Sequence, residues 1–131
     1  MPNTTIETRT GWVADVAAVF DAVQSALREA LRLPEWDRTL RLIEHAPGHF
    51  AVPPGRGPRY TLVEVTMFSG RLLEVKRALY QAIVWNLGAL GVPTADIKIT
   101  LIEAPPENWA SAADSRSPRW ISDLRSRRRT G

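Results

Sequence analysis

An internal repeat constrains the fold of this chain more than any other feature of the sequence. When residues 11–45 are moved forward by 59 positions, they lie on residues 70–104 without a gap, and nine positions are identical. The identities include Gly11 with Gly70, Pro34 with Pro93, and Asp37 with Asp96. In a chain of 131 residues, this period indicates two copies of one supersecondary unit within a single domain.

Each copy has the pattern of a strand, a helix and a second strand. Apolar residues recur at steps of three and four from Leu72 to Leu90, and from Val13 to Leu27 in the first copy, which predicts two amphipathic helices. Both helices are expected to stop at a proline, at Leu33-Pro34 and Val92-Pro93. The predicted strands are residues 3–8, 39–44, 61–67 and 97–103.

Two such units predict an α/β fold in which two β-α-β repeats form a four-stranded sheet with both helices on one face. The residues expected to face the helices are apolar: Leu40, Leu42, Ile97, Ile99 and Leu101. The opposite face mixes apolar and polar residues: Arg41, Ile43, either Leu62 or Val63, Glu64, Lys98, Thr100 and Ile102. Because this face is too apolar for solvent, we expect another subunit to cover it.

The remaining segments complete the domain plan. We expect one domain over residues 1–109, with repeat one at 2–45, a loop rich in Pro and Gly at 46–60, and repeat two at 61–104. Residues 110–131 are expected to be a C-terminal arm with a basic tip and a short helix around Trp120. Six of the arginines lie in the last sixteen residues, and we interpret them as a solvated end, so nucleic acid is not expected as a partner.

The amino-acid composition limits the kinds of site that this chain can form. The chain has no cysteine and only two histidines, so neither a disulfide nor a metal site is expected, and no cofactor is predicted. No apolar run approaches the roughly 20 residues of a membrane helix, and the first residues lack the basic-then-apolar pattern that is typical of a signal peptide. These features favour a cytoplasmic protein with no membrane partner.

The first residues offer a reactive group. If Met1 is removed, Pro2 begins the chain as a secondary amine. Ordinary α-amines titrate at about 7.7 to 8.0, and burial beside cations would lower that value, which suits a general base near neutral pH. The alternative is that proline stands at this position only because it permits removal of methionine.

Several further residues occur in an order that resembles the tautomerase superfamily, especially the longer members that include malonate semialdehyde decarboxylase. The resemblance covers about residues 2–109 and rests on the prolyl start, the two repeats and four short stretches: Asp37-Arg38, Glu44 to Gly48, Ser69-Gly70-Arg71, and Glu103 with Asn108-Trp109. It implies a homotrimer of β-α-β-β-α-β subunits, with Pro2 in a pocket between subunits.

The resemblance also implies roles for single residues. Pro2 would be the catalytic base, Arg71 would bind a substrate carboxylate, Asp37 would orient the chemistry, and Trp109 would form a pocket wall. Ser69 would also bind the substrate, and it occupies the position where the decarboxylase has a second arginine, so the contacts to the substrate differ here. Three alternatives stay open: Arg71 as a solvated residue, Asp37 as a turn cap and Trp109 as core packing.

We therefore predict a cofactor-independent tautomerase that acts on a small 2-oxo acid, a carboxylate substrate, by keto-enol proton transfer. One alternative is malonate semialdehyde decarboxylase or hydratase activity at the same site. Another is a trimeric binding module without catalysis. His45 is expected to be a hydrogen-bonded turn residue and not a catalyst.

Overall fold

The computed structural model describes residues 1–111. The predicted helix around Trp120 and the basic tip lie outside that range. Six elements follow in the order β1 (Asn3–Arg9), α1 (Val16–Leu31), β2 (Leu40–His45), β3 (Thr61–Phe68), α2 (Leu73–Ala89) and β4 (Ile97–Ala104). All four predicted strands and both predicted helices are confirmed, with strand bounds that differ by one residue at most ends. Within these residues, no helix is long and apolar enough to cross a bilayer.

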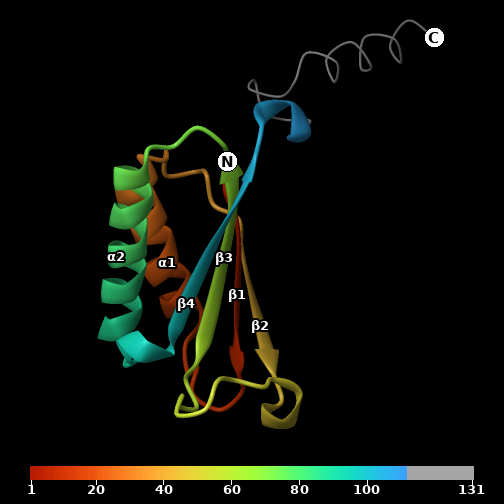
Figure 1. Ribbon diagram of the computed structural model, residues 1–131, viewed down its shortest axis with the longest axis vertical. Coiled ribbons are helices and arrows are strands. Elements are labelled where there is room, and N and C mark those ends of the chain that lie inside the picture. Colours follow the sequence, from red (N-terminus) through yellow and green to blue (C-terminus); the bar gives the residue numbers. More distant parts are fainter. Residues whose placement is uncertain (112–131) are drawn as a thin grey trace, which may run out of the picture.

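The sheet has the strand order β2-β1-β3-β4. β1 runs parallel to β2, and β3 runs parallel to β4, as a β-α-β unit requires. The two central strands, β1 and β3, are antiparallel, with Asn3 opposite Thr66. The two repeats therefore run in opposite directions, and the start of β1 meets the end of β3 at one end of the sheet. Both helices cover the same face (Figure 1).

The two faces of the sheet differ as the alternation predicts. The core consists of apolar residues from both helices, β1 and β3, and the five residues predicted to face the helices pack against it: Leu40, Leu42, Ile97, Ile99 and Leu101. On the open face, Ile43 is 41% exposed and Ile102 is 45% exposed. Val63 is fully buried in the core, so Leu62 is the residue that belongs to the open face.

The helices do not stop at the prolines. α1 ends at Leu31 because Arg32 adopts a left-handed conformation with φ 55°. α2 ends at Ala89, and the equivalent left-handed residue is Gly91, with φ 91°. The amide of Val92 donates to the carbonyl of Leu87 over 3.2 Å, which closes this helix end. A left-handed residue turns the chain away from the helix axis, so each helix ends before its proline is reached.

Local sequence sets the helix starts. Asp15 caps α1, and its carboxylate accepts a hydrogen bond from the amide of Ala18 over 3.3 Å. α2 has no side-chain cap at Leu72, but Glu74 puts a negative charge in its first turn. Both strand-to-helix turns contain a glycine in a conformation that other residues rarely adopt: Gly11 with φ 116° and Gly70 with φ 108°.

Candidate active site

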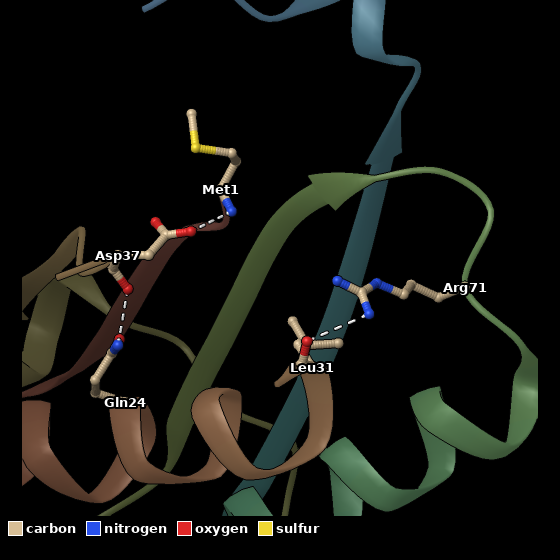
Figure 2. A network of polar contacts seen from close by, with 5 residues as sticks. All are labelled: Met1, Gln24, Leu31, Asp37 and Arg71. Atoms are coloured by element: carbon tan, nitrogen blue, oxygen red, sulfur yellow. Dashed lines mark hydrogen bonds and ion pairs between the residues drawn. The ribbon is translucent and has the colours of Figure 1, made fainter. Parts of the chain in front are cut away.

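The first nitrogen of the chain lies at the end of the sheet where β1 begins. The ammonium group of Met1 donates a hydrogen bond to Oδ2 of Asp37 over 2.6 Å, and the two groups form an ion pair (Figure 2). Asp37 is only 7% exposed, and Pro2 is buried. The structure therefore brings two of the predicted site residues, Pro2 and Asp37, to the same place.

The connection between α1 and β2 holds Asp37 through its backbone. The amide of Asp37 donates to the carbonyl of Pro34 over 3.1 Å, which closes a turn. The carbonyl of Asp37 accepts a hydrogen bond of 2.8 Å from Nε2 of Gln24, a residue of α1 (Figure 2). Gln24 is not among the site residues predicted from the sequence. Its one visible signal is an amide side chain where the equivalent residue of the other repeat is Ile83.

Arg71 lies between β3 and α2, directly after Gly70. Its Nη1 donates to the carbonyl of Leu31, the last residue of α1, over 3.3 Å (Figure 2). Because the connection that carries Asp37 starts directly after Leu31, this bond brings the guanidinium to the same end of the sheet. Arg71 is exposed, and a guanidinium keeps its charge and can hold a carboxylate through two parallel hydrogen bonds.

Ser69 and Trp109 follow the two strands that finish at this end. The amide of Ser69 and the indole Nε1 of Trp109 both donate to the carbonyl of Ala104, over 3.1 Å and 3.2 Å. The Trp109 ring meets the Phe68 ring edge to face, with 5.2 Å between the centroids. Trp109 therefore packs at the rim of the sheet, and its role as a pocket wall stays a prediction.

The ion pair places a buried carboxylate directly beside the start of the chain. Removal of Met1 would move the chain start by one residue, at most about 3.8 Å along the backbone, which keeps the new amine near Asp37. The corner then combines a chain-terminal amine and a buried carboxylate, which can exchange protons, with an exposed guanidinium, which can bind an anion.

His45 lies at the opposite end of the sheet, opposite Arg9. Its Nε2 is 3.0 Å from Oε1 of Glu7, and its ring stacks on Phe50 with 5.1 Å between the centroids. His45 is hydrogen-bonded as predicted, but it is the last residue of β2 and not a turn residue, because it still pairs with Arg9 of β1. In the part of the chain that the structure describes, no group of three His, Asp or Glu side chains could hold a metal ion.

A large surface hollow lies away from this corner. It is formed by the outer side of α2 and is lined by Tyr80, Val84, Trp85 and Gly88, none of which is a predicted site residue. The residues that line the hollow include no ionised group, whereas the corner holds an amine, a carboxylate and a guanidinium.

Comparisons with a family model and with solved structures show what the chain as a whole is similar to. The model of the family described as "Tautomerase enzyme" matches residues 37–112, a stretch that includes Asp37, Arg71 and Trp109. The structure is similar to FG41 malonate semialdehyde decarboxylase inhibited by 3-bromopropiolate, with a TM-score of 0.79 and 26% identity over 93% of this chain and 96% of that one.

Two further solved structures share the fold. One is a fused 4-OT symmetric trimer, with a TM-score of 0.72 and 24% identity over 84% of this chain and 91% of that one. The other is N1, a member of the cis-3-chloroacrylic acid dehalogenase family, with a TM-score of 0.74 and 20% identity over 86% of this chain and 81% of that one. With the family model matching more than half of its length, the chain belongs to the tautomerase family, and within that superfamily its structure is close to malonate semialdehyde decarboxylase.

Proposed function

We propose that this protein is a cofactor-independent enzyme that moves a proton on a small 2-oxo acid, with the amine of Pro2 as the reactive group once Met1 is removed. The observation that carries the proposal is the ion pair of 2.6 Å between the first nitrogen of the chain and Asp37, which is 7% exposed. The pairing of β1 with its neighbouring strands does not require a buried carboxylate at the start of the chain. A chain that keeps Met1 would have an unreactive amide nitrogen at Pro2.

The first candidate reaction is tautomerisation. The neutral amine of Pro2 takes a proton from the carbon next to the carbonyl, and the electron pair of that C–H bond forms the enolate. Arg71 binds the carboxylate and stabilises the negative charge that develops, where a fixed cation contributes most. The amine then returns the proton to another atom of the same substrate, and Asp37 orients the amine during both transfers.

The second candidate is decarboxylation of a 3-oxo acid or a hydratase-type reaction at the same site, with the protonated amine of Pro2 as the acid. In a decarboxylation the bond between the carboxylate and the adjacent carbon breaks, carbon dioxide leaves, and the ammonium group protonates the resulting enolate carbon. FG41 malonate semialdehyde decarboxylase, at 26% identity, supports this candidate.

A homotrimer would supply the rest of the site. On the open face of the sheet, Ile43 and Ile102 are 41% and 45% exposed, which a neighbouring sheet would cover. The fused 4-OT proteins with this fold are trimers. A trimer without catalysis is the remaining alternative, in which the corner binds a carboxylate and Pro2 does not react.

The decisive experiment compares wild type with Pro2→Ala after mass spectrometry has shown that Met1 is absent from both. Phenylenolpyruvate and 2-hydroxymuconate test tautomerisation, and release of carbon dioxide from malonate semialdehyde tests decarboxylation. We expect Pro2→Ala to lower the rate of the active reaction by about 10²-fold or more, because general acid-base groups contribute that much. Equal rates for the two proteins would leave only the binding module.

Arg71→Ala tests substrate binding, and Arg59→Ala is its matched control. Nη1 of Arg59 donates to the carbonyl of Leu90 over 3.3 Å, the same kind of bond that Arg71 makes to Leu31. We expect Arg71→Ala to raise KM by about 10- to 100-fold, whereas Arg59→Ala should change only the stability. If both variants keep the wild-type KM, Arg71 does not bind the substrate.

A further inference from the structure

Gln24 is a buried amide in a helix face that otherwise contacts the core. It lies in the middle of α1 and is 4% exposed. Its Nε2 donates to the carbonyl of Asp37 over 2.8 Å, which joins the helix to the connection between α1 and β2 (Figure 2). A buried amide lowers stability unless its polar atoms find partners, so a residue of this kind in a core needs a reason.

The second repeat shows that the fold itself does not require an amide side chain at this position. The equivalent position is Ile83, which is fully buried. The equivalent aspartate, Asp96, is also buried, but its carboxylate accepts two hydrogen bonds of 3.2 Å from the amide of Gly57. Thus one repeat has an apolar residue at this core position and uses the aspartate carboxylate as a backbone anchor. The other repeat anchors the backbone of the aspartate through Gln24 and leaves its carboxylate for the first nitrogen of the chain.

We propose that Gln24 is a positioning residue that fixes the backbone of Asp37 so that its carboxylate faces the reactive amine. The amide of Asp37 is already held by the carbonyl of Pro34 over 3.1 Å. With Gln24 on its carbonyl, both backbone polar groups of Asp37 are fixed, and only its side-chain torsions remain free. This inference rests on the proposed function, because it assigns Gln24 a role in the same reaction.

Loss of Gln24 should affect kcat and KM differently. Arg71 binds the substrate from another connection, so loss of Gln24 should misplace the amine and Asp37 without weakening the binding of the substrate. We therefore expect Gln24→Met to lower kcat by about tenfold or more while KM stays within about twofold, since small misplacements of reacting groups have large effects on rate. Methionine has a similar length and fills irregular core space, so the helix keeps its packing.

The matched control is Ile83→Met, which puts the same side chain at the equivalent position of the other repeat. It should leave kcat and KM unchanged within about twofold. A double-variant cycle adds a readout that a structural role would not move. If Gln24 acts through Asp37, then Gln24→Met combined with Asp37→Asn should have the same kcat as Asp37→Asn alone. Effects that multiply, or an unchanged kcat in Gln24→Met, would overturn the inference.

Amide hydrogen exchange separates this inference from the proposed function, because it needs no turnover. The amides of residues 32–39 should exchange faster in Gln24→Met than in wild type or Ile83→Met, while both variants keep similar thermal unfolding midpoints. If Gln24→Met does not fold, Gln24→Leu takes its place. Unchanged exchange over residues 32–39 would overturn the role of Gln24 even in an active enzyme, whereas faster exchange in a protein with no activity would refute only the proposed reaction.

Discussion

The two ends of the sheet are related by the repeat but use their aspartates differently. At one end the carboxylate of Asp37 pairs with the nitrogen of Met1 over 2.6 Å. At the other end the carboxylate of Asp96 accepts hydrogen bonds of 3.2 Å from the amide of Gly57, inside a continuous chain. The same residue at equivalent positions therefore anchors a loop in one case and faces a chain terminus in the other. The contact of Asp96 serves the fold, whereas the contact of Asp37 is the one that the proposed reaction would use.

The arginines differ from the aspartates, because two positions that are not equivalent in the repeat make the same kind of contact. Arg71 donates to the carbonyl of Leu31 at the end of α1, and Arg59 donates to the carbonyl of Leu90 just after α2. The position equivalent to Arg71 is Trp12, whose ring centroid lies 5.6 Å from Cζ of Arg59. Both helix ends thus receive a cation, as the helix dipole favours. The bond from Arg71 to Leu31 is therefore a structural contact that accompanies any role in substrate binding.

The largest difference between the two ends of the sheet is expected when each aspartate is replaced by asparagine. Asp37→Asn should lower kcat/KM by about 10²-fold, because it removes the charge next to the reactive amine, and it should change stability little. Asp96→Asn should leave kcat/KM unchanged and lower the free energy of unfolding by about 1 kcal/mol, because an uncharged acceptor makes weaker hydrogen bonds to Gly57. Kinetics and urea unfolding of the two variants measure both quantities. Similar effects of the two substitutions on activity would break the comparison.

A smaller effect is expected at the ends of the helices. Gly91→Ala should lower the free energy of unfolding by about 1 to 3 kcal/mol, because its φ is 91° and the new Cβ would lie 2.3 Å from Nη1 of Arg59. Arg32→Gly should raise it by up to about 1 kcal/mol, because Arg32 has a φ of 55° that costs a side-chain-bearing residue energy. Urea unfolding checks both variants. A loss of stability in Arg32→Gly would show that the arginine side chain makes a stabilising contact.

The smallest effect concerns a glutamate that both repeats share. A hydrogen bond from Lys76 lowers the pKa of Glu103 from its ordinary value of 4.5, against a smaller opposing effect of desolvation, and the charge of Lys76 and the amide of Gly70 act in the same direction as that hydrogen bond. Because the folded pKa is lower, the stabilisation is present above pH 4.5 and is lost as the pH falls through the folded value. Glu44, the equivalent residue, has Ala17 in place of that lysine.

Lys76→Met should return the titration of Glu103 to the ordinary range in an NMR experiment and should not affect Glu44. Glu103 is exposed, so we expect only a small change in stability with this variant. A titration of Glu103 that stays the same after the loss of Lys76 would mean that the amide of Gly70 is the main cause of the shift.

The sequence predicted the sheet well because several signals agreed. The repeat gave two copies of each strand, and alternating residues such as Arg41 and Leu42 marked the two faces. The helix ends were predicted less well, since nothing in the residue type of Arg32 indicates a left-handed conformation. Its partner Gly91 was the available clue, because equivalent turns need equivalent backbone angles.

The candidate site was predictable only in part. The resemblance to a family pointed to Pro2, Asp37 and Arg71, and the structure places the first nitrogen of the chain beside Asp37. The partner of Arg71, the carbonyl of Leu31, depends on how two distant turns pack and has no signal in the sequence. A single glutamine such as Gln24 in a helix is usually a surface residue, so only the superposition of the repeats shows that it occupies a core position.

The antiparallel pairing of β1 and β3 has a consequence for the stoichiometry of reactive centres. A protein assembled from single, unduplicated β-α-β units would place a chain start at both ends of every sheet. Duplication within one polypeptide makes the second start internal, and the residue equivalent to Pro2 is Thr61, whose nitrogen is bound in a peptide. On the proposed mechanism, each copy of this protein therefore has one corner with a reactive chain start and one corner without it. The second corner has only a structural role.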